Sequence, residues 1–382
     1  MNKQYDYIIT GAGCAGLSLL MRLLQEPTLQ HKKILVIDEE PKTKNDRTWY
    51  FWEKDNGLFN EIVHHQWSNL IFKDASFEKQ FSIAPYQYKM ILGIDFYNYV
   101  LQFASKFNNV VFRYEKVLQV NATNQLAEVV LRDEKIYATY IFNSILFEKP
   151  IIKPNQYFLL QHFKGWVIET PQPVFNSGTA TFMDFSINQQ YGTTFMYVLP
   201  IAPNKALVEY TLFTEELLND ATYTIALKKY IQENLGIEEY AITHEEFGQI
   251  PMTNFTFPNK QGNIVYIGIA GGQAKGSSGY AFQFIQKRTQ QIVQSLVKKN
   301  HPFVKNSFNN KKFHLYDSVL LHVLQYKKMD GANIFSAIFK NNSPQTVLQF
   351  LDNETNLLQD FKIMSSVPTN IFLPAAIKEL LQ

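Results

Sequence analysis

Residues 5–38 read YDYIITGAGCAGLSLLMRLLQEPTLQHKKILVID, and this stretch decides the fold. Its apolar runs predict a buried strand over 5–10, a helix over 17–24 and a second buried strand over 34–37. A glycine-rich turn joins the first strand to the helix, and Asp38 ends the second strand. This order of strand, glycine turn, helix, strand and acid is typical of a βαβ dinucleotide-binding unit.

The spacing of the three glycines suits a nucleotide. Gly11 allows the tight turn, Gly13 lets the backbone approach a pyrophosphate, and Gly16 lets helix and strand pack closely. The helix N-terminus presents N–H groups to phosphates, and Asp38, 22 residues after Gly16, can accept hydrogen bonds from a ribose. The predicted cofactor contacts here are Gly11, Gly13, Cys14, Ala15, Gly16 and Asp38. A plain glycine-rich turn without a ligand is the alternative.

The composition limits the kind of protein. The chain has 382 residues, of which 46% are hydrophobic and 18% charged, enough for two domains or one large α/β domain with an inserted sheet. The net charge is only +2, and no Lys/Arg cluster is interleaved with aromatic residues, which argues against nucleic acid as a partner. The 31 Phe and 21 Tyr suit a pocket for a large apolar ligand, although an AT-biased genome would also supply them.

Cysteine usage and the N-terminus bear on localisation. Cys14 is the only cysteine, so the chain has no disulfide framework and a reducing compartment is expected. The first strand starts at the N-terminus without a signal peptide, and no apolar run approaches the ~18 residues that a membrane span needs. No Cys/His cluster has metal-ligand spacing, so no metal site is predicted. We expect a cytoplasmic protein that is soluble or peripherally membrane-associated.

A second glycine-rich unit follows about 250 residues after the first. A buried strand over 264–267 leads into Gly268-Ile269-Ala270-Gly271-Gly272, and a long helix is predicted over 280–299. In a flavin fold this helix would point its N-terminus at the isoalloxazine, where its partial positive charge favours the anion of reduced flavin. Gly268, Gly271 and Gly272 are therefore further predicted cofactor contacts.

The middle of the chain has a different residue pattern, with an aromatic run and several alternating segments. The run Asp46-Arg47-Thr48-Trp49-Tyr50-Phe51-Trp52 could place Arg47 near phosphate or flavin while its rings line a pocket, or it could be a surface loop anchored by buried aromatics. Alternating segments at 158–168, 179–185, 194–200 and 206–213 predict an antiparallel sheet, which a packing helix over 221–235 follows.

These elements give an α/β fold: a Rossmann-like FAD-binding domain, an interleaved antiparallel β-sheet substrate domain and a helical C-terminal region. We expect the FAD-binding domain to comprise residues 1–80, 95–150 and 255–300, and the substrate domain residues 81–94 and 151–254. Residues 301–382 form the helical region, in which the sequence indicates no chemistry.

With these motifs, the chain resembles the flavin-dependent lycopene cyclases, which are related to flavoprotein hydroxylases and reductases. The resemblance covers most of residues 5–300, and these motifs carry it: 11–16, 46–52, Phe182-Met183-Asp184-Phe185, 195–200, 206–211, Gly248-Gln249-Ile250-Pro251-Met252, 268–272 and Ser278-Gly279-Tyr280. Ile269 stands where the hydroxylases usually carry an Asp for the flavin ribityl chain, which is similar to the cyclases. Glu209 stands alone before Tyr210, where the family often has two neighbouring acids.

The resemblance implies cyclisation of the acyclic ψ-ends of lycopene to β-ionone rings (β-carotene formation), without net redox. It implies FAD that is active in reduced form, NAD(P)H as reductant, and lycopene or another acyclic carotenoid taken from lipid by peripheral membrane contact. Such chemistry needs an acid, a means to hold a carbocation, and a base. Glu209 follows the alternating run 206–208 and can face the inner side of the sheet, so it is the expected acid. An exposed strand glutamate is the alternative.

Asp184 lies on a neighbouring predicted strand and is the second candidate catalytic residue. It could orient Glu209 or bind flavin or backbone. Two other functions stay open: a redox flavoenzyme, such as a monooxygenase or prenyl reductase, and a non-catalytic flavin- or carotenoid-binding protein. The sequence does not separate one-end from two-end cyclisation, or β from ε or γ rings.

Overall fold

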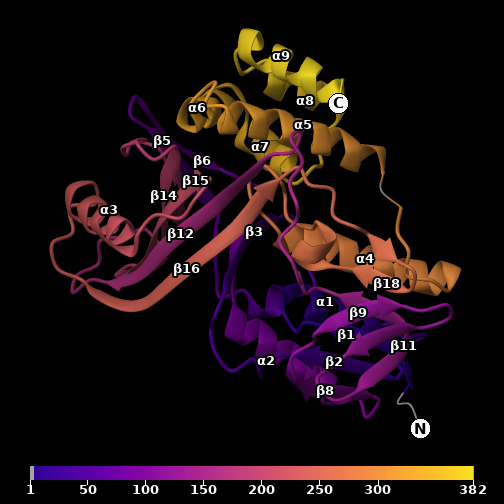
Figure 1. Cartoon of the computed structure of the whole chain (residues 1–382). Coiled ribbons are helices and arrows are strands. Elements are labelled where there is room, and N and C mark those ends of the chain that lie inside the picture. The colour runs from indigo at the N-terminus through magenta and orange to yellow at the C-terminus, as the bar shows by residue number, and fades with distance from the viewer. Residues whose placement is uncertain (1–3, 306, 382) are drawn as a thin grey trace.

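The computed structural model describes residues 4–305 and 307–381. Three sheets and nine α-helices occur among these residues. Figure 1 shows the first sheet at the lower end of the molecule, the second beside it, and the C-terminal helices at the upper end. The α/β fold with a Rossmann-like unit and a helical C-terminal region is confirmed.

The first sheet, which carries both glycine-rich loops, is built on parallel strands. Strand β1 (Gln4–Thr10) lies between β2 (Ile34–Asp38) and β11 (Lys135–Asn143), with β8 (Val110–Tyr114) beyond β2 and β18 (Ile264–Tyr266) beyond β11. Short strands β9 (Gln119–Ala122), β10 (Ala127–Val130) and β17 (Lys260–Gln261) extend its edge. Because the five central strands run in the same direction, both glycine-rich loops leave the same edge of the sheet. Helices α1 (Cys14–Gln25), α2 (Gly93–Ala104) and α4 (Phe282–Lys299) pack in this part of the molecule.

The second sheet has seven strands in the order β16, β12, β15, β14, β13, β5, β6. Their bounds are Ala241–Thr253, Phe158–Glu169, Lys205–Thr214, Thr193–Ala202, Thr179–Asp184, Asn69–Asp74 and Phe77–Ser82. All neighbours are antiparallel except β13 and β5. Residues 69–80 therefore lie in this sheet, although we expected them in the FAD-binding domain. Alternation predicts a strand but not its partner.

A small third sheet lies between the two larger ones. It consists of β3 (Thr48–Glu53), β7 (Gln87–Leu92) and β4 (His65–Trp67), with β7 in the middle. The sequence analysis placed 46–52 and 81–94 in different domains, but their strands pair with each other. This sheet carries the aromatic run that the sequence singled out.

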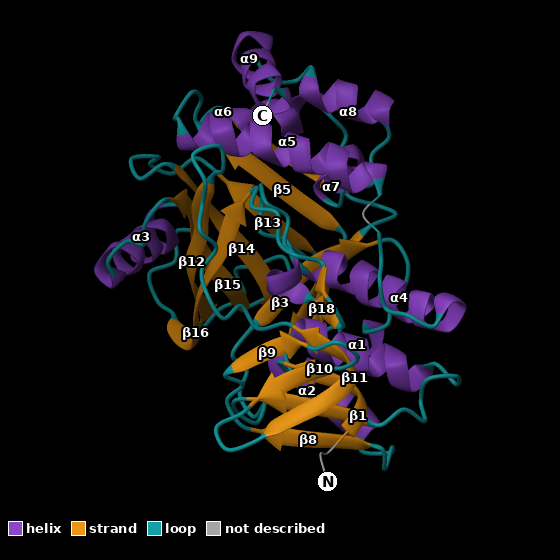
Figure 2. Ribbon diagram, turned by 45° about the vertical axis from the view of Figure 1, so that its right-hand side comes forward, coloured by secondary structure: helices purple, strands orange, loops and turns teal. Residues whose placement is uncertain are grey.

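Helices cover both faces of the seven-stranded sheet. Helix α3 (Asp220–Glu233) packs on one face through Tyr223, Leu227 and Tyr230. The other face belongs to the largest apolar core, which also contains residues of the C-terminal helices. Those helices are α5 (Phe308–Gln325), α6 (Gly331–Asn341), α7 (Pro344–Leu351), α8 (Leu357–Met364) and α9 (Thr369–Leu380). Figure 2 shows α3 and the C-terminal helices at different sides of this sheet.

Candidate active site

Two of the three glycines in the first glycine turn have no space for a side chain. Gly11 has φ +93°, and a Cβ there would come within 2.1 Å of Ser144 Oγ. A Cβ at Gly16 would lie 2.0 Å from the Gly11 carbonyl oxygen. At Gly11 the left-handed φ favours glycine, and at Gly16 a larger residue would have to displace backbone, so both glycines are required for the turn.

Gly13 is different because the space beside it is open. A Cβ on Gly13 would meet no atom within 4 Å, and no side chain caps the first turn of α1. That turn also contains no acidic residue. An uncapped helix N-terminus next to open space fits a diphosphate, which its backbone N–H groups can bind.

Cys14 and Arg47 lie close to this helix N-terminus. Burial raises the pKa of the Cys14 thiol to about 12, a hydrogen bond from Ser18 opposes the shift, and the Arg47 guanidinium opposes it further. The thiol is therefore protonated and packs as a small side chain. The Arg47 side chain is 69% exposed, and its Nε forms a long ion pair of 3.9 Å with Asp46 Oδ2, so most of the guanidinium is accessible to an anion at the loop.

Asp38 contacts the glycine turn itself. Its Oδ2 accepts a hydrogen bond from the Ala12 N–H at 2.6 Å, and Lys42 Nζ lies 3.0 Å from Oδ1. The carboxylate thus braces the turn at the end of β2. Its role on a ribose remains a prediction.

The second glycine loop meets the first through Gly268. This residue has φ +62°, and a Cβ there would lie 3.0 Å from the Ala15 Cβ. Gly271 also has no space for a side chain, because a Cβ would be 2.3 Å from the Tyr266 carbonyl oxygen. Gly268 therefore joins the predicted contacts of the first loop, whereas Gly271 and Gly272 border a polar cleft on the side of α4 and α5.

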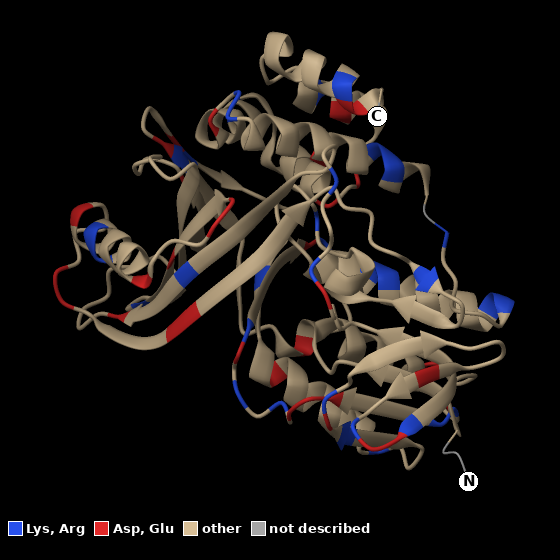
Figure 3. Cartoon of the chain, viewed as in Figure 1, with Lys and Arg blue, Asp and Glu red and all other residues tan. Residues whose placement is uncertain are grey.

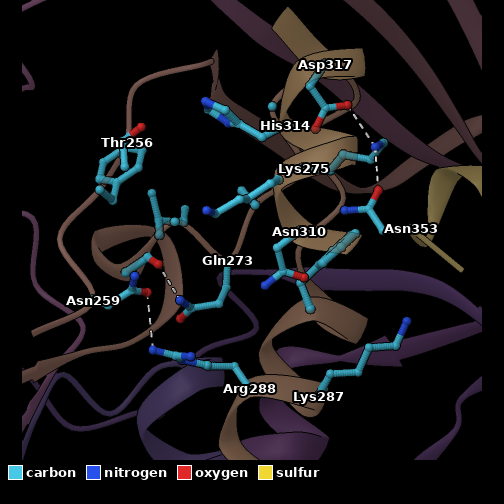
Figure 4. Close-up of a pocket in the computed structure, with 18 of the residues that line it drawn as sticks. Thr256, Asn259, Gln273, Lys275, Lys287, Arg288, Asn310, His314, Asp317 and Asn353 are labelled. Carbon is cyan, nitrogen blue, oxygen red and sulfur yellow. Dashed lines mark hydrogen bonds and ion pairs between the residues drawn. The ribbon is translucent and has the colours of Figure 1, made fainter. Parts of the chain in front are cut away.

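That cleft, shown in Figure 4, has a volume of about 630 Å³. Lys275 inside it pairs with Asp317 at 2.8 Å and donates to Asn353 at 2.7 Å, and Arg288 donates to Asn259 at 3.2 Å. Neither Glu209 nor Asp184 lines it. The cleft is thus separate from the carboxyl site described next.

Glu209 lies in β15, between β12 and β14 of the seven-stranded sheet, and is buried. Its neighbour across β12 is Gly165, and the neighbour of Gly165 on β16 is Glu246. Because Gly165 has no side chain, the two carboxyl groups share one face with only a glycine between their strands. A Cβ on Gly165 would lie 3.0 Å from Glu246 Cγ and 3.2 Å from its Oε1.

This arrangement makes a buried carboxyl pair, Glu209 and Glu246. Burial, and then the charge of Glu246, raise the pKa of Glu209 well above its usual value, against a 2.7 Å hydrogen bond from Thr211. Burial also raises the pKa of Glu246, while a hydrogen bond from Glu209 lowers it. Glu209 is therefore the member that holds the shared proton. Part of the Glu246 residue is exposed, but its Oε1 is buried and has no hydrogen-bond partner among the described residues.

Aromatic side chains surround the pair. Tyr197 lies beside Glu209 on β14, and its hydroxyl is 3.1 Å from that of Tyr280. Burial raises the pKa of Tyr50 and of Tyr88 well above the usual range, and the charge of Glu209 adds to both shifts. The rings are thus neutral and close to the carboxyl pair. Aromatic faces of this kind stabilise cations.

Asp184 does not join Glu209. Its Oδ2 accepts from the Tyr230 hydroxyl of α3 at 2.7 Å, and its Oδ1 accepts from the Ser186 N–H at 2.8 Å. Lys73 Nζ lies 3.8 Å away. Asp184 therefore belongs to the face that α3 covers, on the other side of the sheet. The strand carries a register irregularity between residues 181 and 184, which the sequence pattern does not reveal.

Glu246 and Tyr50 were missed as site residues from the sequence. Glu246 stands two positions before Gly248 of the Gly-x-Ile-Pro motif, so the two residues share a face of β16. Tyr50 lies inside the aromatic run 46–52, and the packing of Trp52 on Tyr280 at 4.7 Å shows that this run is partly core. The motif spacing pointed to Glu246, but only strand pairing brings it to Glu209.

In residues 4–305 and 307–381, no helix is long and apolar enough to cross a membrane. The same part of the chain contains no group of three or more His, Cys, Asp or Glu side chains that could hold a metal ion.

Comparison with solved structures establishes the fold class. A flavoprotein/dehydrogenase from Cytophaga hutchinsonii superposes with a TM-score of 0.68, 12% identity and 99% coverage of both chains. A geranylgeranyl bacteriochlorophyll reductase-like protein from Thermoplasma acidophilum gives 0.60, with 13% identity over 99% of this chain and 98% of that one. The p-nitrophenol 4-monooxygenase of Pseudomonas putida also gives 0.60, with 10% identity over 99% and 98%.

Sequence comparison is more particular than the fold. A lycopene beta-cyclase from Pantoea ananas is 25% identical in an alignment of 265 residues that covers 66% of this chain and 64% of that relative. The aligned part thus spans less than two thirds of the relative's length. The family model for lycopene cyclase protein matches residues 6–376. The chain therefore belongs to the lycopene cyclase family.

Proposed function

We propose that this protein binds FAD and converts the acyclic ψ-ends of lycopene, or of a related acyclic carotenoid, to β-ionone rings. The family match supports the reaction class. The single observation that carries the proposal is the buried pair Glu209 and Glu246, which lies across Gly165 and is surrounded by neutral tyrosine rings. Such a site can donate a proton to an alkene and hold the cation that forms.

The two glycine loops are the proposed FAD site. Gly13 and the uncapped start of α1 fit the diphosphate, the exposed guanidinium of Arg47 is accessible to its charge, and Gly268 lies against the first loop. When bound and reduced, FAD would supply negative charge beside the cation. NAD(P)H is the proposed reductant of the flavin and is not consumed with each ring.

The carboxyl pair accounts for the proton transfers. Glu209 gives its proton to the terminal double bond of the ψ-end, which forms a C–H bond and leaves a tertiary cation. The neighbouring alkene attacks this cation and closes the ring. Loss of a ring proton to the carboxyl pair then forms the ring double bond, so substrate and product have the same formula. The aromatic wall excludes water, which would otherwise trap the cation.

Expression in cells that accumulate lycopene tests this proposal. Wild-type protein should produce β-rings that chromatography of the pigments detects, and Glu209→Gln should abolish them while the purified protein keeps its flavin. A normal yield of β-carotene from Glu209→Gln would rule out Glu209 as the acid. Gly13→Val should remove the flavin, because its side chain fills the open space beside α1.

A redox flavoenzyme is the second candidate function, and the fold supports it because reductase and monooxygenase structures share it. It predicts consumption of one NAD(P)H for each product formed, whereas the cyclase needs only catalytic reductant. A non-catalytic flavin- or carotenoid-binding protein would leave the carotenoid spectrum unchanged. We propose a cytoplasmic location with peripheral membrane contact, because the proposed substrate dissolves only in lipid.

A further inference from the structure

The last two helices expose a concentration of large apolar side chains. In α8 these are Leu357, Leu358, Phe361 and Met364, and at α9 they are Leu373, Ile377, Leu380 and Leu381. We call these eight residues the α8–α9 patch. Leu358 is 84% exposed and Leu381 83%. Figures 1 and 2 show both helices at the end of the molecule farthest from the nucleotide-binding sheet.

The exposed charged residues within residues 357–381 are both lysines. Both acids of residues 357–381 are buried in contacts: Asp360 pairs with Lys312 at 2.6 Å, and the Glu379 side chain meets Tyr157. Both lysines of the same segment, Lys362 and Lys378, are exposed. Figure 3 shows α9 almost without charged segments except near its C-terminal end. The outer surface is therefore apolar with positive charge, which complements an anionic lipid surface.

The apolar core continues from this surface to the carboxyl pair. Ile363 of α8 and Ala375 of α9 belong to the same core cluster as Tyr88 and Tyr197, which lie beside Glu209. A protein partner would explain the exposed patch but not its continuity with the site. A carotenoid dissolved in lipid explains both features, because it must pass from the bilayer to Glu209 among apolar side chains.

We propose that the α8–α9 patch is the membrane-docking surface, which lies in the headgroup region of an anionic bilayer. The inference rests on the proposed function for its choice of lipid as the occupant. The apolar side chains enter the interface while Lys362 and Lys378 meet anionic headgroups. Neither helix crosses the bilayer, in agreement with the absence of a spanning helix in the described residues.

Vesicle co-sedimentation of the purified full-length protein tests this surface. The probes are phosphatidylcholine vesicles with and without phosphatidylglycerol. The variant Leu358→Glu/Phe361→Glu/Leu380→Glu should lose binding by about tenfold or more, because three large apolar groups no longer enter the interface. The matched control Ile151→Glu/Val174→Glu/Ile225→Glu changes equally exposed apolar residues elsewhere and should bind within about twofold of wild type.

The two exposed lysines allow a second, independent test in the same vesicle assay. Lys362→Gln/Lys378→Gln should weaken binding to the anionic vesicles by about fivefold or more and leave binding to neutral vesicles unchanged. Wild type that does not bind either vesicle, or a patch variant that binds like wild type, overturns the proposal. A wild-type dimer that the patch variant converts to monomers without any vesicle binding overturns it too, since a second copy would then cover the patch.

Activity separates this proposal from the proposed function. With lycopene in detergent micelles, the patch variant should form rings at the wild-type rate. With lycopene in vesicles, its rate of ring formation should fall by the same factor as its vesicle binding. If wild type binds vesicles but never cyclises lycopene, the proposed function fails and the docking surface stands. If wild type cyclises lycopene in micelles but does not bind vesicles, the proposed docking surface is wrong and the proposed function stands.

Discussion

The two faces of the seven-stranded sheet each bury an acid, and the two acids have opposite surroundings. On the α3 face, Asp184 accepts hydrogen bonds from Tyr230 and Ser186 and has Lys73 nearby. On the other face, Glu209 has Thr211, a second carboxyl group and aromatic rings, and no cation pairs with it among the described residues. The hydrogen bonds of Asp184 join β13 to α3 and so suit a structural role, whereas burial beside another acid makes Glu209 a proton donor.

The largest expected effect separates the two faces directly. Glu209→Gln should lower the rate of ring formation by about 10²–10⁴-fold, the usual contribution of a general acid. Asp184→Asn should change that rate by less than about threefold and instead destabilise the fold by about 1–3 kcal/mol, because buried hydrogen bonds are weakened. Pigment formation by purified, flavin-loaded variants and chemical unfolding measure both. Equal losses of activity would remove the distinction between the faces.

Glu246→Gln should shift the pH dependence of the reaction. The charge of Glu246 raises the pKa of Glu209, so its removal lowers that pKa. The rate of wild type falls as pH rises through the raised pKa, and in the variant the fall should come at lower pH, with a loss of about tenfold near neutrality for a one-unit shift. A profile of ring formation against pH checks this. An unchanged profile would mean that the two acids do not interact.

Gly165→Ala tests the geometry between the carboxyl groups. The added methyl would lie 2.9 Å from Leu207 Cδ1 and 3.0 Å from Glu246 Cγ, so Leu207 must shift and Glu246 must give way slightly. We expect about a tenfold loss of ring formation with flavin content unchanged, as misplacement of about 1 Å at a site can cost even more. Gly178→Ala is the control, because its Cβ would meet nothing closer than 3.5 Å. Wild-type activity in Gly165→Ala would argue against the shared site.

The smallest effect concerns stability. The pKa values of Glu209 and Glu246 are raised in the folded state, so the folded protein holds protons that the unfolded chain releases above about pH 4.3. The free energy of unfolding should therefore fall as pH rises from this value towards the raised folded pKa values. Glu209→Gln/Glu246→Gln should remove that slope and be more stable than wild type by about 1–3 kcal/mol near neutral pH. Urea titrations at several pH values give this free energy for both proteins. The same dependence on pH in wild type and in the double variant would contradict the prediction.

Local patterns made much of the fold predictable. The strand, glycine turn and helix of residues 5–24 became β1 and α1, and the helix expected over 221–235 is α3 at Asp220–Glu233. These signals depend on neighbouring residues, so sequence alone carries them. The placement of Glu209 on the inner face also followed from alternation along β15.

Long-range pairing explains what could not be predicted. Glu209, Gly165 and Glu246 come from three strands, and only their register places the two acids around one glycine. The sequence left open whether Asp184 orients Glu209 or binds flavin or backbone, because the register irregularity before Asp184 on β13, which goes with its place on the opposite face, cannot be read from alternation. Strands β5 and β6 were grouped with the nucleotide part because alternation does not name a partner.

The central claim is that a proton from the buried carboxyl pair starts ring formation. The most direct measurement uses reduced, flavin-loaded protein that has been equilibrated in D₂O and mixed in excess with lycopene in micelles, so that each site turns over once. Mass spectrometry of the product should find one deuterium in each new β-ring with wild type and no ring with Glu209→Gln. Rings without deuterium would contradict the claim.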